Sequence, residues 1–293
     1  MKTEKEMMEL ILKVAEDDER ILAVYLNGSR ANPNITKDIF QDYDIVYVVD
    51  ETISFINDEN WIDIFGQRLY MQLPEKLDNE LGLDVNLEQC YGYLIQFADG
   101  SRLDLRLMNL DYAREQIMND KLTVILRDKD NLLPAIPSSS DIDYWVKRPT
   151  ETQFRACCNE FWWCLNNVAK GMWREEILYV MDMLDSVIRV ELKKMLTWYA
   201  GIKTGFSVSV GKSGKFLDKY LSQDLWDRFL KTYPTANINS MCEAIFIMCS
   251  LFDEVAEIAS EEFEFNYDKT EAMNSIMFLN NAKILPKSAT AVL

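Results

Sequence analysis

Three aspartates carry the strongest chemical signal in this 293-residue chain. Asp42 and Asp44 are one residue apart, and Asp44 opens the apolar segment DIVYVVD (44–50), which predicts a β-strand. Side chains at positions i and i+2 of a strand point to the same side, so we expect both carboxylates on one face. In the later segment RLDLRL the leucines alternate with polar residues, which places Asp104 on the face away from the core. All three carboxylates could therefore meet.

Carboxylates that converge are hard oxygen ligands of the kind that bind Mg²⁺. Three of them can hold two metal ions about 3.5–4 Å apart, which stabilises the attacking and the leaving oxygen of an in-line displacement. An acidic pair at a strand edge is common without a metal, so Asp42 and Asp44 alone are weak evidence. Together with Asp104 they predict a site for two Mg²⁺ ions.

A turn suited to phosphate follows the apolar segment ILAVYLN (21–27), which predicts another strand. Gly28 permits a close approach of the backbone to a ligand. The amides that follow it and the hydroxyl of Ser29 could cradle the β- and γ-phosphates at a helix N-terminus. Arg30 could add a charge-assisted contact. This order of strand, Gly-Ser turn and Asp-x-Asp is far more specific than an acidic pair.

The composition narrows the possible chemistry. The chain contains no histidine, which excludes Ser-His-Asp and Cys-His catalysis and histidine-bound zinc. Its net charge of −17 disfavours sequence-independent binding to DNA or RNA. Such an acidic surface attracts cations, either metal ions or a polyamine-like substrate, although it could also serve solubility alone.

Segments along nearly the whole chain resemble the aminoglycoside 6-adenylyltransferases, which act on streptomycin. The segments that carry the resemblance are NGSRANPN (27–34), FQDYDIVYVV (40–49), DGSRLDLRL (99–107), RDKDN (127–131), KRPTETQFRACCNEFWWC (147–164), AKGMWREEI (169–177) and VGKSGKF (210–216). The resemblance implies a polymerase-β-like nucleotidyltransferase domain followed by a helical domain. It also implies transfer of AMP from Mg·ATP to a hydroxyl of streptomycin, position 6 by the family's name, which causes antibiotic resistance.

By the same resemblance, Asp42 and Asp44 match the metal ligands, and Asp104 matches the third carboxylate and general base. Gly28 and Ser29 match the nucleotide-binding turn. One position departs from the family, which tends to have Leu-Asp-Leu-Thr-Leu where this chain has Arg106. A cation beside the catalytic carboxylate would lower its pKa and weaken it as a base, unless Arg106 turns away.

Candidate ligand-binding residues also occur in the second half of the chain. Lys147 precedes a predicted helix, and Lys212 and Lys215 lie in a glycine-containing loop, FSVSVGKSGKF (206–216). All three could reach the triphosphate, and all three could equally be solvated. The loop lacks the four-residue spacing of a phosphate-binding P-loop, so a P-loop kinase is excluded.

The aromatic segment CCNEFWWC (157–164) could recognise a cationic sugar. Glu160 and Trp163 are three residues apart on a predicted helix, with Asn159 close by, and an acid beside an aromatic ring suits guanidinium or ammonium groups. Asp182, on a later predicted helix, is a weaker candidate of the same kind. The alternative is a helix whose aromatic residues pack in the core and whose acids are solvated.

These residues need a framework, and the patterns predict an α+β protein. Residues 1–135 are expected to form the nucleotidyltransferase domain, 136–149 a linker, and 150–293 an all-helical bundle that binds the substrate. Thr3 and Glu6 can form a capping box for a helix over 4–17. The remaining predictions are a short helix at 54–65, strands at 68–73, 93–97 and 102–108 with a hairpin turn at 98–101, and helices over 150–200, 222–231, 236–260 and 268–281.

The chain is expected to be soluble and cytoplasmic. Its N-terminus is too charged for a signal peptide, and no apolar run is long enough to span a membrane. The six cysteines form no CxxC pair, and those at 157, 158 and 164 are expected to be buried and reduced. The sequence leaves the oligomeric state open, with a monomer slightly favoured.

Two other functions remain open. The chain could be a nucleotidyltransferase that modifies a protein or nucleic acid, although its acidity argues against RNA. It could also be a binding protein on the same fold that senses nucleotide or sequesters a cationic drug, although three intact carboxylates argue against a protein without catalysis.

Overall fold

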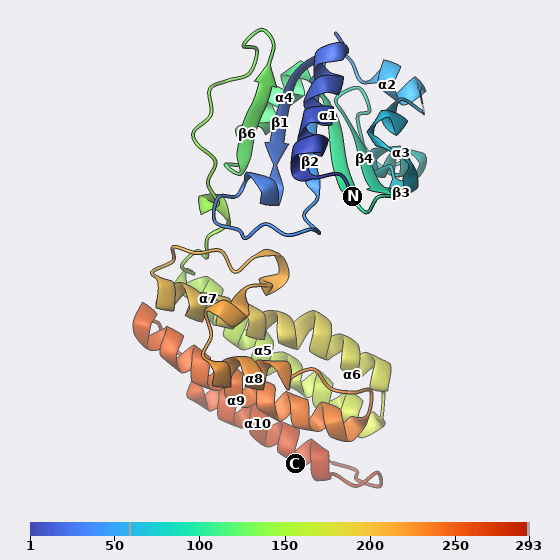
Figure 1. The fold of residues 1–293 in the computed structure, drawn as a ribbon. Coiled ribbons are helices and arrows are strands. Elements are labelled where there is room, and N and C mark those ends of the chain that lie inside the picture. Colours follow the sequence, from blue (N-terminus) through green and yellow to red (C-terminus); the bar gives the residue numbers. More distant parts are fainter. Residues whose placement is uncertain (59, 292–293) are drawn as a thin grey trace. The chain divides into compact units, whose positions relative to one another are not determined.

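The structure is a computed structural model that describes residues 1–58 and 60–291. The chain forms two compact units, Met1–Asp143 and Tyr144–Leu293. The first unit contains a mixed sheet with helices and the second is helical (Figure 1). The predicted α+β class is therefore confirmed, whereas the roles assigned to the two domains stay predictions.

A six-stranded sheet forms the centre of the first unit. Its strands lie in the order β3-β4-β5-β2-β1-β6. The pair β2–β5 is parallel, and every other neighbouring pair is antiparallel. In chain order the strands are β1 (Ile21–Asn27), β2 (Tyr43–Val49), β3 (Arg68–Gln72), β4 (Cys90–Phe97), β5 (Arg102–Asn109) and β6 (Thr123–Asp128).

Helices pack on both faces of this sheet. α1 (Glu4–Asp17) lies across one face (Figure 1), where its apolar residues join the larger of two buried clusters. α4 (Leu110–Gln116) contributes to the smaller cluster on the other face. The remaining short helices and 3₁₀ turns of this unit are η1 (Gly28–Ala31), α2 (Ile53–Asn57), η2 (Trp61–Phe65) and α3 (Pro74–Glu80), and η3 (Ile142–Tyr144) lies at its end.

The alternation of side chains along β2 and β5 sets up the site. Leu105 belongs to the cluster on the α1 side, whereas Val46 and Met108 belong to the cluster on the α4 side. Because successive side chains of a strand alternate between faces, Asp44 and Asp104 lie on the α4 side as well. This face is thus acidic near the beginning of both strands and apolar further along.

Local sequence signals account for most of these boundaries. Thr3 and Glu6 form the predicted capping box, in which the Glu6 amide donates to Thr3 Oγ1 (3.2 Å) and the Thr3 amide donates to Glu6 Oε2 (2.7 Å). The helix over 4–17 and the strand over 21–27 are confirmed at both ends. The predicted turn joins β4 to β5, with Gly100 at φ 89°.

Other predictions in the first unit need correction. The single helix expected over 54–65 is wrong, because α2 and η2 are two separate short elements. Three elements were missed: α3, α4 and β6. Each is short, at six or seven residues, so a 3.6- or 2-residue period has little room to show.

The second unit is a helical bundle, as predicted. Its helices are α5 (Glu151–Arg174), α6 (Ile177–Met183), α7 (Arg189–Thr204), α8 (Gln223–Leu230), α9 (Ile238–Phe263) and α10 (Lys269–Ile284), with a π-helical stretch at Leu184–Ile188 and short 3₁₀ turns at Lys212–Gly214 and Leu217–Lys219. The helical region expected over 150–200 is interrupted at Glu175, which adopts left-handed φ/ψ and ends α5. α6 can therefore turn back onto α5.

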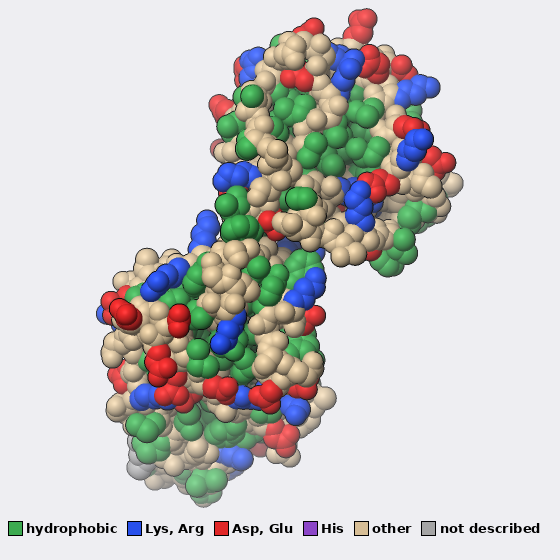
Figure 2. Space-filling view, turned by 60° about the vertical axis from the view of Figure 1, so that its left-hand side comes forward, with side chains coloured by type: hydrophobic (Ala, Val, Ile, Leu, Met, Phe, Trp, Pro, Cys, Tyr) green, Lys and Arg blue, Asp and Glu red, His purple; other side chains and the backbone are tan. Residues whose placement is uncertain are grey.

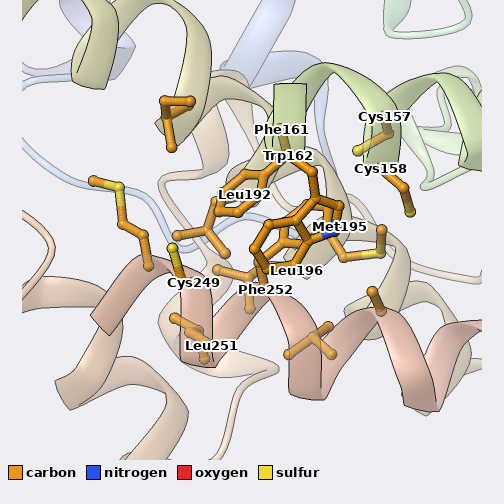
Figure 3. Close-up of a cluster of buried hydrophobic side chains, with 14 of the residues drawn as sticks. Cys157, Cys158, Phe161, Trp162, Leu192, Met195, Leu196, Cys249, Leu251 and Phe252 are labelled. Carbon is orange, nitrogen blue, oxygen red and sulfur yellow. The ribbon is translucent and has the colours of Figure 1, made fainter. Parts of the chain in front are cut away.

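An aromatic cluster occupies the core of the bundle. Phe161 of α5 stacks on Phe252 of α9 with ring centroids 3.9 Å apart, and Trp162 meets Phe252 edge-on at 5.5 Å (Figure 3). The cysteines expected to be buried, at positions 157, 158 and 164, are buried and free. Within the part of the chain that the structure describes, no helix is both long and apolar enough to cross a bilayer.

Candidate active site

Three carboxylates come together at the beginning of β2 and β5. Asp44 lies directly beside Asp104 in the parallel pairing of the two strands, and Asp42 precedes β2. One carboxylate oxygen from each of the three lies within 4.8 Å of the others. The structure thus brings together the aspartates singled out in the sequence, and the parallel pairing is what does so.

Asp44 is partly buried and lies beside the other two carboxylates. Burial and the neighbouring carboxylates of Asp42 and Asp104 raise its pKa to about 7. Arg102 and Arg106 oppose this rise in the pKa only in part. A bound cation would offset the repulsion between this partly buried carboxylate and its two neighbours.

The arrangement fits a divalent metal. Three aspartate oxygens on one face are the hard ligands that Mg²⁺ accepts, and a protein site for this ion is commonly completed by water and substrate phosphates. The raised pKa of Asp44 is consistent with this interpretation, because the carboxyl is partly buried and two further carboxylates lie beside it. The residues that would hold the ion are Asp42, Asp44 and Asp104.

Gly28 stands directly against the carboxylate of Asp44. Its φ is +69°, and a Cβ at this position would lie 2.1 Å from Asp44 Oδ2. Any other residue would strain the backbone and displace the carboxylate. The Gly-Ser turn and the acidic cluster are therefore parts of one site.

Ser29 lies in the 3₁₀ turn η1, half-buried, and its hydroxyl has no hydrogen-bond partner among residues 1–58 and 60–291. It is therefore available to a ligand, and its predicted contact with phosphate stays a prediction. The helix N-terminus expected behind it is a single 3₁₀ turn of four residues.

Arg30 is already engaged within the protein. Its Nε and Nη2 donate to the carbonyl oxygens of Asp42 (2.9 Å) and Gln41 (2.8 Å). Nη1 lies 3.4 Å from Glu4, and the guanidinium stacks on the ring of Tyr43 at 3.8 Å. These contacts hold the backbone that carries Asp42 in place, and the predicted contact of Arg30 with phosphate stays a prediction.

Arg102 is the cation that the sequence analysis did not single out. Its Nε and Nη2 donate to Asp104 Oδ1 (2.8 Å) and Oδ2 (2.6 Å), and Nε lies 3.8 Å from Asp42 Oδ2. From the sequence, Arg106 alone was expected as a cation beside Asp104. The same i, i+2 spacing relates Arg102 to Asp104, so alternation along the strand could have identified it.

The three lysines assigned to the nucleotide lie in the second unit and are exposed. Lys147 lines a groove between α5 and α7. Lys215 is 5.0 Å from the ring centroid of Phe216, and Lys212 begins a short 3₁₀ turn. Their contact with triphosphate stays a prediction.

The predicted acceptor residues do not share one pocket. Glu160 lines the groove between α5 and α7, about 580 Å³, together with the buried Glu191 and Trp198. Asn159 lines a different groove of about 770 Å³ between α5 and α10, where its amide donates to Glu271 Oε1 at 2.6 Å. Asn159 and Glu160, although adjacent on α5, therefore face two different grooves.

The other two candidates are surface residues. Trp163 is 66% exposed, which is unusual for a tryptophan and leaves its ring open to a ligand. Asp182 is exposed and accepts a hydrogen bond from Ser186 Oγ at 3.1 Å.

Two residues of the groove between α5 and α7, Glu191 and Trp198, were not predicted from the sequence. Their burial in this groove depends on how α7 packs on α5.

Comparison with known proteins extends these observations to the whole chain. A family model described as streptomycin adenylyltransferase matches residues 1–282. The match includes all of Met1–Asp143, most of Tyr144–Leu293 and all residues of the candidate site.

Three curated proteins named aminoglycoside 6-adenylyltransferase are similar to this chain. The one from Campylobacter jejuni is 40% identical over 267 residues, 91% of each chain. The one from Bacillus subtilis is 40% identical over 268 residues, 91% of this chain and 93% of its own. The one from Staphylococcus aureus is 38% identical over 282 residues, 96% of this chain and 99% of its own.

A solved structure, described as an aminoglycoside 6-adenyltransferase from Bacillus subtilis, aligns with 97% of this chain and 100% of that chain. The sequence identity is 33% and the TM-score is 0.48.

Proposed function

Because the chain belongs to the streptomycin adenylyltransferase family, we propose that it transfers AMP from Mg·ATP to the hydroxyl at position 6 of streptomycin. The chain is an enzyme of an adenylyltransferase family, and its relatives named above support adenylyl transfer to aminoglycosides. The proposed products are adenylylated streptomycin and pyrophosphate, and the proposed consequence is antibiotic resistance.

One observation carries the proposal. The carboxylates of Asp42, Asp44 and Asp104 converge within 4.8 Å of one another. They do so directly against Gly28, the residue that opens the predicted phosphate turn. The proposed metal ligands therefore lie next to the proposed phosphate-binding turn, which is the arrangement that an in-line displacement at a phosphorus atom requires.

Each residue has a defined task in the proposed reaction. The amides after Gly28 and the hydroxyl of Ser29 bind the phosphates that leave. Asp104 accepts the proton of the attacking hydroxyl. A bond forms between that oxygen and the α-phosphorus, the bond from the α-phosphorus to the bridging oxygen breaks, and pyrophosphate departs. Two Mg²⁺ ions held by the three aspartates would neutralise the charge that develops on the phosphate oxygens.

The helical unit offers acidic and aromatic groups for a cationic acceptor. Glu160 and the buried Glu191 line one groove, and the exposed ring of Trp163 lies on the same helix as Glu160. A guanidinium or ammonium group can pair with the carboxylates and lie over the ring. We propose Glu160 and Trp163 as acceptor-binding residues, with Asn159 and Asp182 in a secondary role.

Pyrophosphate release with Mg·ATP tests the proposal, across a panel of streptomycin, spectinomycin, kanamycin and a lincosamide. The Asp42→Ala protein serves as the blank. Release with streptomycin alone, lost in the variant, is the expected result. Folded protein that releases pyrophosphate with none of these acceptors would contradict it.

The Asp104→Asn variant tests whether Asp104 acts as the proton acceptor and is not needed for nucleotide binding. The amide keeps the size of the side chain but cannot accept the proton, so we expect transfer to fall by about 10²–10⁴-fold, the usual contribution of a general base. Binding of ATP to the Asp104→Asn protein, measured by calorimetry, should stay within a few-fold of wild type. Undiminished turnover would remove Asp104 from this role.

A further inference from the structure

Arg102 lies over two of the three carboxylates of the candidate active site. Its guanidinium binds both oxygens of Asp104, at 2.8 and 2.6 Å, and its Nε lies 3.8 Å from Asp42 Oδ2. The fork of the guanidinium matches the two oxygens of a carboxylate, so this contact is strong and directional. The side chain is nevertheless 47% exposed and thus free to leave on the solvent side.

The other two arginines near the cluster, Arg30 and Arg106, do not pair with its carboxylates. Arg30 is 8% exposed and donates to backbone carbonyl oxygens. Arg106 is exposed and has no carboxylate within 4.0 Å in the parts of the chain that the structure describes. Arg102 is therefore the cation that balances Asp104 and Asp42.

This position conflicts with a metal. Arg102 binds both oxygens of Asp104, so a divalent ion held by Asp42, Asp44 and Asp104 would compete for an oxygen that Arg102 already uses, and it would lie next to a guanidinium of like charge. If the Arg102 guanidinium leaves these carboxylates, another anion is needed to pair with its positive charge. The triphosphate of the nucleotide offers oxygens in the geometry that arginine prefers, and it arrives together with the metal.

We propose that Arg102 is an exchangeable counter-ion of the carboxylate cluster. In the metal-free protein it pairs with Asp104 and Asp42, and when metal and nucleotide load it releases them and binds the triphosphate. The inference rests on the proposed function in one respect, namely that the three aspartates form the metal site. It makes Arg102 a positioning residue in one state and a nucleotide ligand in the other.

The test compares wild type with Arg102→Ala, Arg102→Lys and Arg106→Ala in the full-length protein. Arg106 lies four residues beyond Arg102 on the same face of β5 and is the matched control for loss of one positive charge. The first probe is Mn²⁺ alone, with free ion counted by electron paramagnetic resonance. We expect Arg102→Ala to bind Mn²⁺ about ten-fold more tightly, because a charge-assisted pair no longer competes, and Arg106→Ala to differ less than about three-fold.

The second probe is a non-hydrolysable ATP analogue with Mg²⁺, followed by calorimetry. Here we expect the opposite direction, with Arg102→Ala binding about ten-fold more weakly and Arg102→Lys in between, since lysine keeps the charge but lacks the fork. Tighter metal binding combined with weaker nucleotide binding is a crossed pattern that general damage to the fold would not produce.

The results separate the two ideas. If wild type takes up Mn²⁺ but Arg102→Ala takes it up equally or more weakly, the inference is overturned and the proposed function stands. An equal change in Arg106→Ala, or unchanged binding of the nucleotide analogue, also overturns it. If neither wild type nor any variant binds Mn²⁺, the proposed metal site fails, and the inference fails with it.

Discussion

At the scale of single residues, the site concentrates charge at a cost in stability. Burial raises the pKa of Asp44 to about 7, and the neighbouring carboxylates of Asp42 and Asp104 contribute to this rise. In the unfolded chain the same carboxyl ionises near its ordinary value of about 4. The folded protein therefore holds on to this proton more strongly, and loses stability as pH rises between these two values.

Replacing Asp44 by asparagine should stabilise the metal-free protein. We expect Asp44→Asn to raise the free energy of unfolding at pH 8 by on the order of 1–3 kcal/mol. The gain should shrink as pH falls from about 7 to about 4 and vanish below the unfolded pKa, where the carboxyl is protonated in both states. Thermal unfolding in EDTA at several pH values measures this, with the exposed Asp130→Asn as control. A gain that did not depend on pH would contradict the account, and adenylyl transfer should be lost.

Gly28 gives a second test at this scale. In Gly28→Ala the new Cβ would lie 2.1 Å from Asp44 Oδ2 on a backbone with φ +69°, so the carboxylate must move. We expect adenylyl transfer to fall by about 10²-fold, the order of loss that misplaced reacting groups produce. The assay is initial-rate transfer.

The control for this substitution is Gly82→Ala. Gly82 has φ +78°, and a Cβ there would meet no atom within 4 Å. Both variants carry the backbone cost of a positive φ, about 1–2 kcal/mol, but only Gly28→Ala disturbs a carboxylate. Similar losses of activity in the two proteins would show that strain, and not the position of Asp44, is responsible.

At the scale of elements, the parallel pair β2–β5 creates the site. The pairing sets Asp44 opposite Asp104, and the hairpin that joins β4 to β5 delivers β5 to that position. Because the register of a strand has a period of two, a slip by one residue would turn Asp104 toward the α1 side of the sheet. The leucines of β5, fully buried on that side, oppose such a slip.

In the second unit, α5 and α9 are joined by the aromatic cluster of Figure 3. Phe252 is fully buried and touches both Phe161 and Trp162. We expect Phe252→Ala to lower the free energy of unfolding by about 3–5 kcal/mol, since truncation leaves a cavity. Six of the seven tryptophans lie in Tyr144–Leu293, so tryptophan fluorescence in a denaturant titration reports on this unit.

A matched control for Phe252→Ala is Leu178→Ala on α6, where the side chain is 85% exposed. It should change the free energy of unfolding by less than about 0.5 kcal/mol. A small effect of Phe252→Ala would mean that the bundle closes around the truncated side chain.

At the scale of the whole molecule, the charge of −17 favours a cationic acceptor. On the face seen in Figure 2, acidic and basic side chains are interspersed, so the attraction comes from the overall excess of acid. Salt screens such a field beyond about 10 Å at 0.1 M ionic strength.

We therefore expect the KM for streptomycin to rise several-fold between low and high ionic strength, with kcat nearly unchanged. Steady-state kinetics at a series of NaCl concentrations measures the effect, and choline chloride in place of NaCl controls for specific binding of Na⁺. A KM that did not respond to ionic strength would show that only local contacts attract the acceptor.

Much of the local structure follows from the sequence alone. Interactions between residues two to four positions apart determine the capping box at Thr3, the boundaries of α1 and the common face of Asp42 and Asp44. The absence of histidine limits the proton chemistry in the same direct way. The family, too, can be identified from motifs read along the chain.

Only the tertiary structure decides which distant residues meet. The sequence does not specify that β5 pairs with β2 in parallel, or that Asn159 and Glu160 face different grooves. Each of these depends on how strands and helices far apart in the chain pack together. Packing is governed by the burial of whole apolar faces, and no local pattern of residues contains that information.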